Sequence, residues 1–458
     1  MAGFKNLYYW YQKTKMSPFL NDTIETAIRI CFVYTLFVIV YFGCDKVSAM
    51  ERKPNILLFT IDACRPDHFG CYGYSKNLTP NIDTLAKEGA LFINAFSQSA
   101  WTTPGMISIF TSLYPFTHKV EARGDSLNTK VVTLPEILRD NGYAVPVLPR
   151  FVDIPNYWNL GFDAVEKGQF GGKEGEDLLK LLHAYKDQPF FIWYHYHGLH
   201  LPYNPPDFYR KEIAEADGMK PANESEGISL IKTKSVIKHD AVVFTDEDKS
   251  LAVTLYDSQL LPLDDYIGRL AAKLKEWELY EDTIIIITSD HGEELFEHGF
   301  VGHASTSLNA KLYDEIIKIP LIILWPNKIT HKRIGANVQQ IDIMPTILDM
   351  LGIAKTNESE GRSLLPLMKN DKDGKSSVIY CETIMGGYQS TEALRNIRLR
   401  CIRTERWKLI AKNGHNVNTY ELYDLESDPG EKNNVAGKYP DIAVDLKEKL
   451  LAKTGDNK

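Results

Sequence analysis

Two long apolar stretches in this chain lead directly into an aspartate, and this feature restricts the fold more than any other. Residues 54–62 read PNILLFTID, and residues 283–290 read TIIIITSD. Residues 189–195 (PFFIWYH) and 319–326 (IPLIILWP) are similar uncharged runs. Continuous apolar runs of this length predict strands that are buried on both faces, as in a parallel sheet.

Helical patterns alternate with these strands, which predicts an α/β fold. The expected helices cover residues 84–88, 134–140, 175–185 and 250–277. Such alternation indicates a doubly wound, mostly parallel sheet flanked by helices. Sites in these folds lie at the carboxyl ends of the strands. We therefore expect Asp62 and the Asp290-His291 pair to meet in one crevice.

The last part of the chain has a different pattern. Residues 369–376 read as a polar linker, and the stretches that follow it alternate as in antiparallel strands, at 378–382, 399–404 and 407–412. A terminal helix is expected from about Pro440. We predict a catalytic domain over 54–368 and a smaller C-terminal α+β subdomain over 377–455. The polar segment 205–249 is interpreted as a mobile lid or an insertion over the site.

The N-terminus contains the apolar run Ile30–Phe42 (ICFVYTLFVIVYF), preceded by Arg29. Its length fits the apolar region of a signal peptide at 30–43, with residues 1–29 as the basic leading segment. Two alternatives are an uncleaved membrane anchor with residues 1–29 in the cytoplasm and a lipoprotein site at Cys44. All three export residue 54 onward to a periplasmic or extracytoplasmic location. A buried core helix is the fourth interpretation.

Composition excludes some partners and leaves others open. The formal net charge of −8 offers no basic surface for nucleic acid. The pairs Cys64/Cys71 and Cys381/Cys401 could form disulfides in an exported protein or remain free thiols. The sequence does not indicate an oligomeric state.

A nucleophile is predicted at the start of a helix. In the segment Trp101–Met106 (WTTPGM), Pro104 fits the first helical position with Thr103 as the cap, which places Thr102 just before the helix. Backbone N–H groups and the helix dipole favour a tetrahedral anion there. A hydroxyl is a poor nucleophile at neutral pH, so Thr102 needs a metal ion to activate it.

Asp62, Asp290 and His291 can hold that metal, with Thr102 as the fourth ligand. This mixture of oxygen and nitrogen donors favours one divalent ion, Zn²⁺ or Mn²⁺. Ca²⁺ remains an alternative, although it usually gathers more oxygen ligands.

Three further side chains are candidates for contact with the substrate. His200 follows the strand predicted at 189–195, His303 follows the Asp290-His291 pair, and Lys311 lies further along. Histidine can neutralise an oxyanion or protonate a leaving group. A surface or core role is the alternative for each. We expect His195, His197 and His298 to be structural or outer residues.

These segments resemble the sulfatase family of the alkaline-phosphatase superfamily, from about Pro54 to Val435. The matching motifs are Asp62 with Gly70–Tyr74, Thr102-x-Pro104, Ser289–Glu293, Leu312–Glu315 and Leu422–Leu425. The resemblance implies an ester hydrolase with a bound divalent metal. It also shows departures: the family has a modifiable Cys or Ser at Thr102, an Arg at Met106, a second acid at Ala63 and a Lys where His303 stands.

The expected substrate is a small anionic ester of a sugar, a lipid or an aryl alcohol, either sulfated or phosphorylated. Thr102 favours phosphate mono- or diesters, because a threonine sulfate lacks the exit through an aldehyde that formylglycine provides. A true arylsulfatase-like sulfuric ester hydrolase is the first alternative. The others are a membrane-anchored transferase of phospho-headgroups, favoured by the run 30–43, and a non-catalytic binding protein.

Overall fold

The computed structural model describes residues 52–148, 160–165, 176–216, 225–369, 374–414 and 417–455. The predicted N-terminal segment 30–43, whether signal peptide, anchor or lipoprotein region, lies outside these ranges, as do linker residues 370–373. Within the described residues, no helix is both long enough and apolar enough to cross a bilayer.

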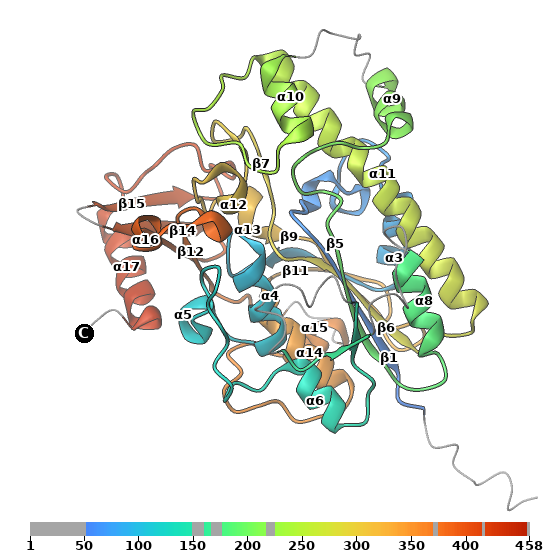
Figure 1. The fold of residues 1–458 in the computed structure, drawn as a ribbon. Helices are drawn as coiled ribbons and strands as arrows, with labels where there is room; N and C mark the ends of the chain where they lie inside the picture. Colours follow the sequence, from blue (N-terminus) through green and yellow to red (C-terminus); the bar gives the residue numbers. More distant parts are fainter. Residues whose placement is uncertain are drawn as a thin grey trace, which may run out of the picture. The chain divides into compact units, whose positions relative to one another are not determined.

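The predicted α/β fold with a mostly parallel sheet is confirmed (Figure 1). Among the described residues, the largest sheet has seven strands. Its spatial order is β11 (Lys332–Gln339), β2 (Ala90–Phe96), β10 (Leu321–Leu324), β6 (Thr283–Ser289), β1 (Asn55–Ile61) and β5 (Phe191–Tyr196), with β9 (Lys318–Ile319) also paired to β2. The β10 and β9 strands run antiparallel to their neighbours.

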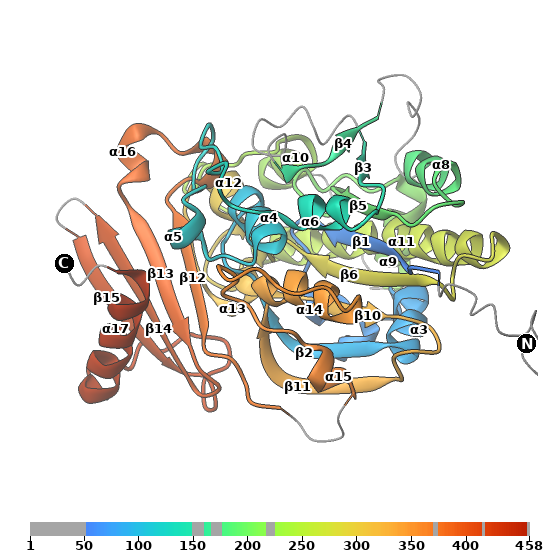
Figure 2. The ribbon, with the colours of Figure 1, turned by 90° about the horizontal axis from the view of Figure 1, so that it is seen from below.

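The central strands are the apolar runs of the sequence. Every residue of β1 and β6 is buried, because helices cover both faces of the sheet. On one face α3 (Pro80–Glu88) packs on β10 and β2, and α11 (Asp246–Glu276) packs on α3. On the other face lie α4 (Thr102–Thr111) and α14 (Ile343–Met350) (Figure 2).

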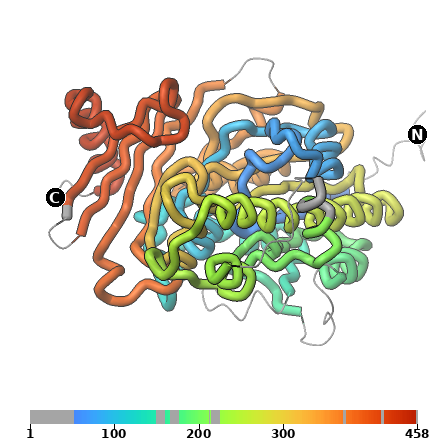
Figure 3. The backbone as a smooth tube through the Cα atoms, turned by 90° about the horizontal axis from the view of Figure 1, so that it is seen from above, coloured from blue at the N-terminus to red at the C-terminus, as the bar shows by residue number. Residues whose placement is uncertain are grey.

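The other helices follow the sequence signals closely. A capping box between Thr133 and Glu136 begins α6 (Leu134–Asp140), and another between Thr245 and Asp248 begins α11, which crosses the molecule as one long coil (Figure 3). The remaining helices of the α/β part are α5 (Pro115–His118), α8 (Glu176–Ala184), α9 (Asp207–Ala216), α10 (Glu226–Thr233), α12 (Ala304–Ser307), α13 (Asp314–Ile317) and α15 (Leu365–Lys369).

One local prediction at the nucleophile helix is wrong. The α4 helix begins at Thr102 itself, and Trp101 is the N-cap without a side-chain capping bond. Pro104 therefore occupies the third helical position. A proline is tolerated there because backbone N–H groups in the first turn have no helical acceptor.

Shorter two-stranded pairs complete the α/β part. Two pairs, β3 (Pro146–Val147) with β4 (Asp163–Ala164) and β7 (Glu294–Leu295) with β8 (Val301–Gly302), lie outside the main sheet. Residues 205–249 were predicted as a lid or insertion, and their described parts hold α9 and α10.

The C-terminal antiparallel sheet is confirmed. Its strands pair in chain order as β12 (Ile379–Ile384), β13 (Arg398–Arg403), β14 (Trp407–Gly414) and β15 (Val417–Asp424), with the short α16 (Glu392–Arg395) between β12 and β13. The terminal helix α17 (Pro440–Thr454) packs on β13 and β14 (Figures 2 and 3). Cys381 and Cys401 face each other across β12 and β13 as free thiols, as are Cys64 and Cys71, so the disulfide alternative is wrong for both pairs.

A buried ion cluster ties the C-terminal sheet to the α/β part. Lys408 on β14 is fully buried, and its Nζ lies 2.8 Å from Asp314 Oδ1 at the start of α13 and 2.8 Å from Glu431 Oε1. Arg403 on β13 also pairs with Asp314, at 2.9 Å. Burial raises the pKa of Glu431 to about 7, although the ammonium of Lys408 opposes this shift. The cluster is therefore stable only while its cation is in place.

We expect Lys408→Met to lower the free energy of unfolding by about 3–5 kcal/mol, because it removes the buried cation beside Glu431 and leaves Asp314 with Arg403 alone. Urea unfolding followed by circular dichroism measures this change. The matched control is Lys449→Met, which breaks an exposed pair with Asp445 on α17 and should cost less than about 1 kcal/mol. Equal effects of the two substitutions would contradict a stabilising role for the cluster.

Candidate active site

Parallel strand pairing assembles the centre of the site. Ile61 lies opposite Ser289 of β6 and Tyr196 of β5, so the residues that follow these three strands come together. Asp62 follows β1, and Asp290 and His291 follow β6. This confirms the expectation that the two aspartates share one crevice at the carboxyl edge of the sheet.

Four buried side chains converge at this edge. His291 Nε2 lies 3.6 Å from Asp62 Oδ1 and 3.4 Å from Asp290 Oδ2. His195, from the end of β5, places its Nε2 3.8 Å from Asp62 Oδ2 and 3.7 Å from Asp290 Oδ2. Two overlapping groups, Asp62/Asp290/His291 and Asp62/His195/His197, have the spacing of a metal site.

The region around Asp290 holds that residue rigidly. Its carbonyl oxygen accepts hydrogen bonds from Ser97 Oγ at 2.6 Å and Gln340 Nε2 at 2.7 Å, and its Oδ1 accepts one from the His291 amide at 2.9 Å. Helix α4 approaches the same carbonyl closely at Gly105, where a Cβ atom would lie 2.7 Å from that oxygen. Glycine at this position therefore lets the start of α4 lie against Asp290.

The Thr102 hydroxyl faces this group. Its Oγ1 lies 3.4 Å from His291 Nε2. The other ring nitrogen of His291, Nδ1, lies 2.7 Å from the Gly292 carbonyl, which can only accept a hydrogen bond, so Nε2 carries no proton in the neutral ring and presents a lone pair. The structure thus places Asp62, Thr102, Asp290 and His291 together, as the sequence predicts.

Burial and neighbouring charges set the protonation of the two aspartates. Burial opposes ionisation of Asp62, yet the imidazoles of His200, His197 and His195 hold its pKa well below the ordinary value. Burial raises the pKa of Asp290 to about 6, with His291 opposing this shift and Asp62 adding to it. At neutral pH both carboxylates are ionised, although they lie within one buried group.

These residues fit a divalent cation. Asp62 Oδ1, Asp290 Oδ2 and His195 Nε2 are buried without a hydrogen-bond partner within the described structure. Two ionised carboxylates and neutral imidazoles are suitable ligands for Zn²⁺ or Mn²⁺. A cation at this point would compensate two buried negative charges that otherwise repel each other.

A cavity of about 270 Å³ opens beside Thr102. His200 and His303 both line it, and their ring centroids lie 5.0 Å apart. His303 is buried, and its Nδ1 lies 2.9 Å from Glu293 Oε1. Burial, together with His291 and His200, holds the pKa of His303 well below its ordinary value, so its ring is neutral.

The rim of the cavity comes from separate parts of the chain. Ser235 and Val236 belong to the segment predicted as a lid or insertion, and Tyr388 and Gln389 follow β12 of the C-terminal sheet. Tyr388 packs edge-on against Trp101, and the Arg123 guanidinium lies 4.7 Å from the centre of its ring. The wall that would contact a substrate alcohol is therefore aromatic and polar.

Lys311 lies outside the cavity beside Thr102. Its Nζ binds Glu294 Oε2 at 2.5 Å and the His298 carbonyl at 2.8 Å, and the residue is not among those that line the cavity. Nothing in the sequence pattern indicates this ion pair.

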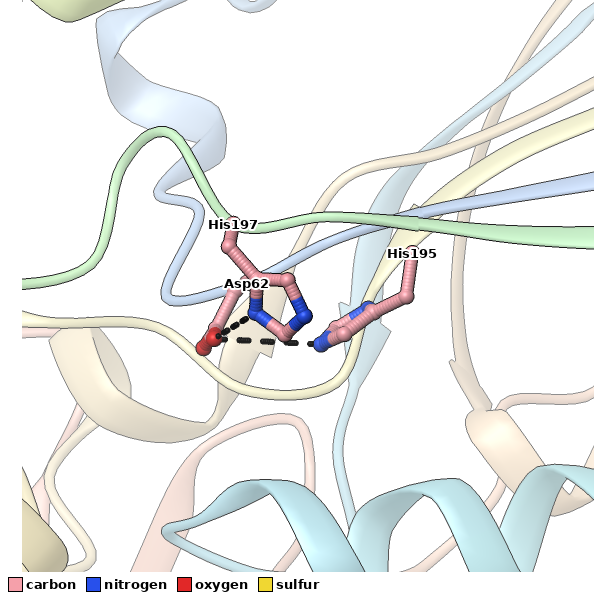
Figure 4. A group of neighbouring side chains, drawn as sticks. All are labelled: Asp62, His195 and His197. Atoms are coloured by element: carbon pink, nitrogen blue, oxygen red, sulfur yellow. Dashed lines mark hydrogen bonds and ion pairs between the residues drawn. The ribbon is translucent and has the colours of Figure 1, made fainter. Parts of the chain in front are cut away.

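His195 and His197 are expected to be structural or outer residues, and both point toward Asp62 (Figure 4). His197 Nδ1 lies 2.9 Å from Asp62 Oδ2. A signal was available in the sequence, because residues two apart on a strand share a face. Two histidines at this spacing at the end of a strand next to β1 could have been assigned to the same edge as Asp62.

Comparisons with known proteins agree over almost the whole described chain. A family model described as "Sulfatase" matches residues 54–353. A second, described as "N-sulphoglucosamine sulphohydrolase, C-terminal", matches residues 308–456. The C-terminal match covers the antiparallel sheet and α17.

Characterised relatives match over most of their length. Arylsulfatase K of Mus musculus is 30% identical, with 88% of this chain and 80% of the relative covered. N-acetylglucosamine-6-O-sulfatase of Bacteroides thetaiotaomicron is 24% identical, with 84% and 83% covered.

Solved structures share the fold. The phosphonate monoester hydrolase of Agrobacterium radiobacter has a TM-score of 0.70 at 23% identity, covering 87% of this chain and 95% of that protein. The protein BT4656, in complex with its substrate D-glucosamine-2-N,6-O-disulfate, has a TM-score of 0.68 at 22% identity, covering 89% and 99%.

We expect the affinity for Zn²⁺ to fall as the pH drops below about 6. The raised pKa of Asp290, about 6, means that protons compete with the metal below this value and not above it. Calorimetric titration of the metal-free protein between pH 5 and 8 measures the effect. Asp290→Asn should bind weakly throughout and lose the step near pH 6. An unchanged affinity from pH 5 to 7 in the unmodified protein would contradict this assignment.

Proposed function

This chain belongs to the sulfatase family, and from that premise we propose that it is a single-metal hydrolase of phosphate esters with Thr102 as its nucleophile. Hydrolysis of an ester bond is the chemistry of the family. The observation that supports the finer proposal is the Thr102 hydroxyl, 3.4 Å from His291 Nε2 at the edge of the buried carboxylate and imidazole group.

Asp62, Asp290 and His291 would hold the cation. When bound, a divalent cation would lower the pKa of the Thr102 hydroxyl and neutralise charge on the ester oxygens. The chain itself supplies the placement: α4 aims its N-terminal N–H groups and its dipole at the position of the anion. Burial raises the pKa of Glu293, which keeps its carboxyl protonated to donate to His303 Nδ1; the neutral, buried ring of His303 then donates from Nε2 to a non-bridging oxygen.

The reaction then proceeds in two displacements. Thr102 Oγ1 attacks phosphorus and the bond from phosphorus to the substrate alcohol breaks, which leaves a phosphothreonine. His200, which lines the same cavity, accepts the hydroxyl proton and returns it to the departing alcohol. Water then attacks phosphorus, the bond from phosphorus to Thr102 Oγ1 breaks, and a proton of the water passes to Oγ1, which restores the hydroxyl and releases the phosphate product. The sum consumes one ester and one water and yields one alcohol and one phosphate.

Hydrolysis of sulfate esters is the second candidate. The names of the relatives favour it, because N-acetylglucosamine-6-O-sulfatase and arylsulfatase K are sulfatases. The nucleophile favours phosphate. Thr102 carries no aldehyde hydrate that could expel sulfate by collapsing, whereas a phosphothreonine can be cleaved by water at phosphorus.

The substrate alcohol is proposed to be a sugar. The cavity rim combines aromatic rings at Trp101 and Tyr388 with hydroxyl and amide groups at Ser235, Ser305 and Gln389. Aromatic faces and hydrogen-bonding groups of this kind suit a pyranose ring better than a lipid tail. Sugar substrates of the relatives agree with this choice.

The same proposal includes a catalytic domain over residues 54–368 and a C-terminal subdomain over 377–455. It also places the protein outside the cytoplasm. Membrane attachment through residues 30–43, if this segment is uncleaved, remains a prediction.

We expect Thr102→Ala to lower kcat/KM for bis(p-nitrophenyl) phosphate by about 10³-fold or more, because it removes the atom that attacks. Thr102→Ser should retain turnover within about tenfold. The control is Thr84→Ala on the exposed side of α3, whose hydroxyl bonds only the Pro80 carbonyl. Full activity in Thr102→Ala would eliminate the proposed nucleophile.

Parallel assays with nitrophenyl phosphate, bis(p-nitrophenyl) phosphate and nitrophenyl sulfate separate the two candidates. We expect a phosphate ester to have the highest kcat/KM, and chelation of the metal to abolish turnover of all three substrates. A kcat/KM for the sulfate above that of both phosphates would replace the first candidate by the second.

A further inference from the structure

Three buried polar atoms at the site point to a common partner. Asp62 Oδ1, Asp290 Oδ2 and His195 Nε2 make no hydrogen bond in the described structure, and their residues are almost completely buried. An unpaired buried polar atom destabilises the folded state. All three residues belong to the two overlapping groups with metal-site spacing, so a bound cation could satisfy these atoms.

The distances match donors arranged around one cation. His195 Nε2 lies 3.7–3.8 Å from the two carboxylates, and His291 Nε2 lies 3.4–3.6 Å from them. These separations are too long for hydrogen bonds. Two ligands that each lie about 2.1 Å from a metal at a tetrahedral angle are about 3.4 Å apart. The imidazole of His195 thus has the spacing of a ligand.

The ring of His195 is fixed from behind. Its Nδ1 lies 2.8 Å from Thr60 Oγ1, and this oxygen also accepts a hydrogen bond from Trp193 Nε1 at 2.9 Å. Histidine ligands usually have such an oxygen partner on the second nitrogen, which orients the ring. Figure 4 shows the His195 side chain reaching across to Asp62.

We propose that His195 is a further protein ligand of the metal, in addition to Asp62, Asp290, His291 and Thr102, and that the site therefore selects Zn²⁺ over Ca²⁺. This inference rests on the proposed function, in which a divalent metal activates Thr102. Position 63 is an alanine and offers no ligand. Two carboxylates and two imidazoles suit Zn²⁺, whereas Ca²⁺ takes six to eight oxygen ligands.

His197 has a different role in this arrangement. Its side chain is 44% exposed, and its Nδ1 is within hydrogen-bond distance of Asp62 Oδ2, at 2.9 Å. This contact orients the carboxylate without occupying the metal position. His195, on β5, is therefore a ligand, and His197, just after β5, is a positioning residue.

The test is a zinc titration of metal-free, full-length protein by competition with a chelator, with Ca²⁺ titrated separately. We expect one Zn²⁺ per chain, bound much more tightly than Ca²⁺. His195→Ala should weaken Zn²⁺ binding by more than the 10–100-fold that is typical of residues around a ligand. His197→Ala should stay within that range. The control is His183→Ala on α8, whose ring contacts Trp277, and it should bind Zn²⁺ as the unmodified protein does.

Two further measurements distinguish the loss of a metal ligand from misfolding of the variant. His195→Gln keeps a side chain of similar size and should lose Zn²⁺ affinity to the same degree as His195→Ala. Cobalt substituted for zinc should give a visible absorption spectrum that changes in both His195 variants and not in His183→Ala. Unchanged zinc affinity and cobalt spectrum in the His195 variants would overturn this inference alone. Absence of any bound metal in the unmodified protein would overturn the proposed function together with it.

Discussion

The parallel pairing of β1 with β6 is the constraint on which the site depends. It aligns Ile61 with Ser289, so that Asp62 and Asp290 follow their strands side by side. Both strands are fully buried, and a slip by one residue would turn their side chains to the opposite face. The adjoining β5 adds His195 and His197 to the same edge by the same logic.

Much of this could be derived from the sequence, because buried parallel strands are uninterrupted apolar runs and their carboxyl ends share an edge. The grouping of Asp62, Thr102, Asp290 and His291 followed from that reasoning and from helix chemistry. The strands β2 and β11 were not predicted. They read ALFINAF and KRIGANVQ, and both mix polar with apolar residues. The polarity of β11 is explained by its place at the sheet edge, where part of the strand meets solvent.

The sequence could not locate single side chains within the loops. Lys311 is near His303 in the chain, but the loop that carries it turns the ammonium toward Glu294. His195 lies in a strand that is buried on both faces. A burial pattern predicted from the sequence does not separate this histidine from its apolar neighbours. Its importance depends on which face of β5 meets Asp62, and this is a property of the assembled sheet.

The cavity beside Thr102 has a further consequence for the synthesis of this protein. Its first wall is present once the segment around Thr102 has been made, but Tyr388 and Gln389 come from near the other end of the chain. The cluster that attaches their sheet requires Lys408 and Glu431, which are synthesised later still. A chain that ends before Tyr388 would therefore carry Asp62, Thr102 and Asp290 without this wall of the cavity.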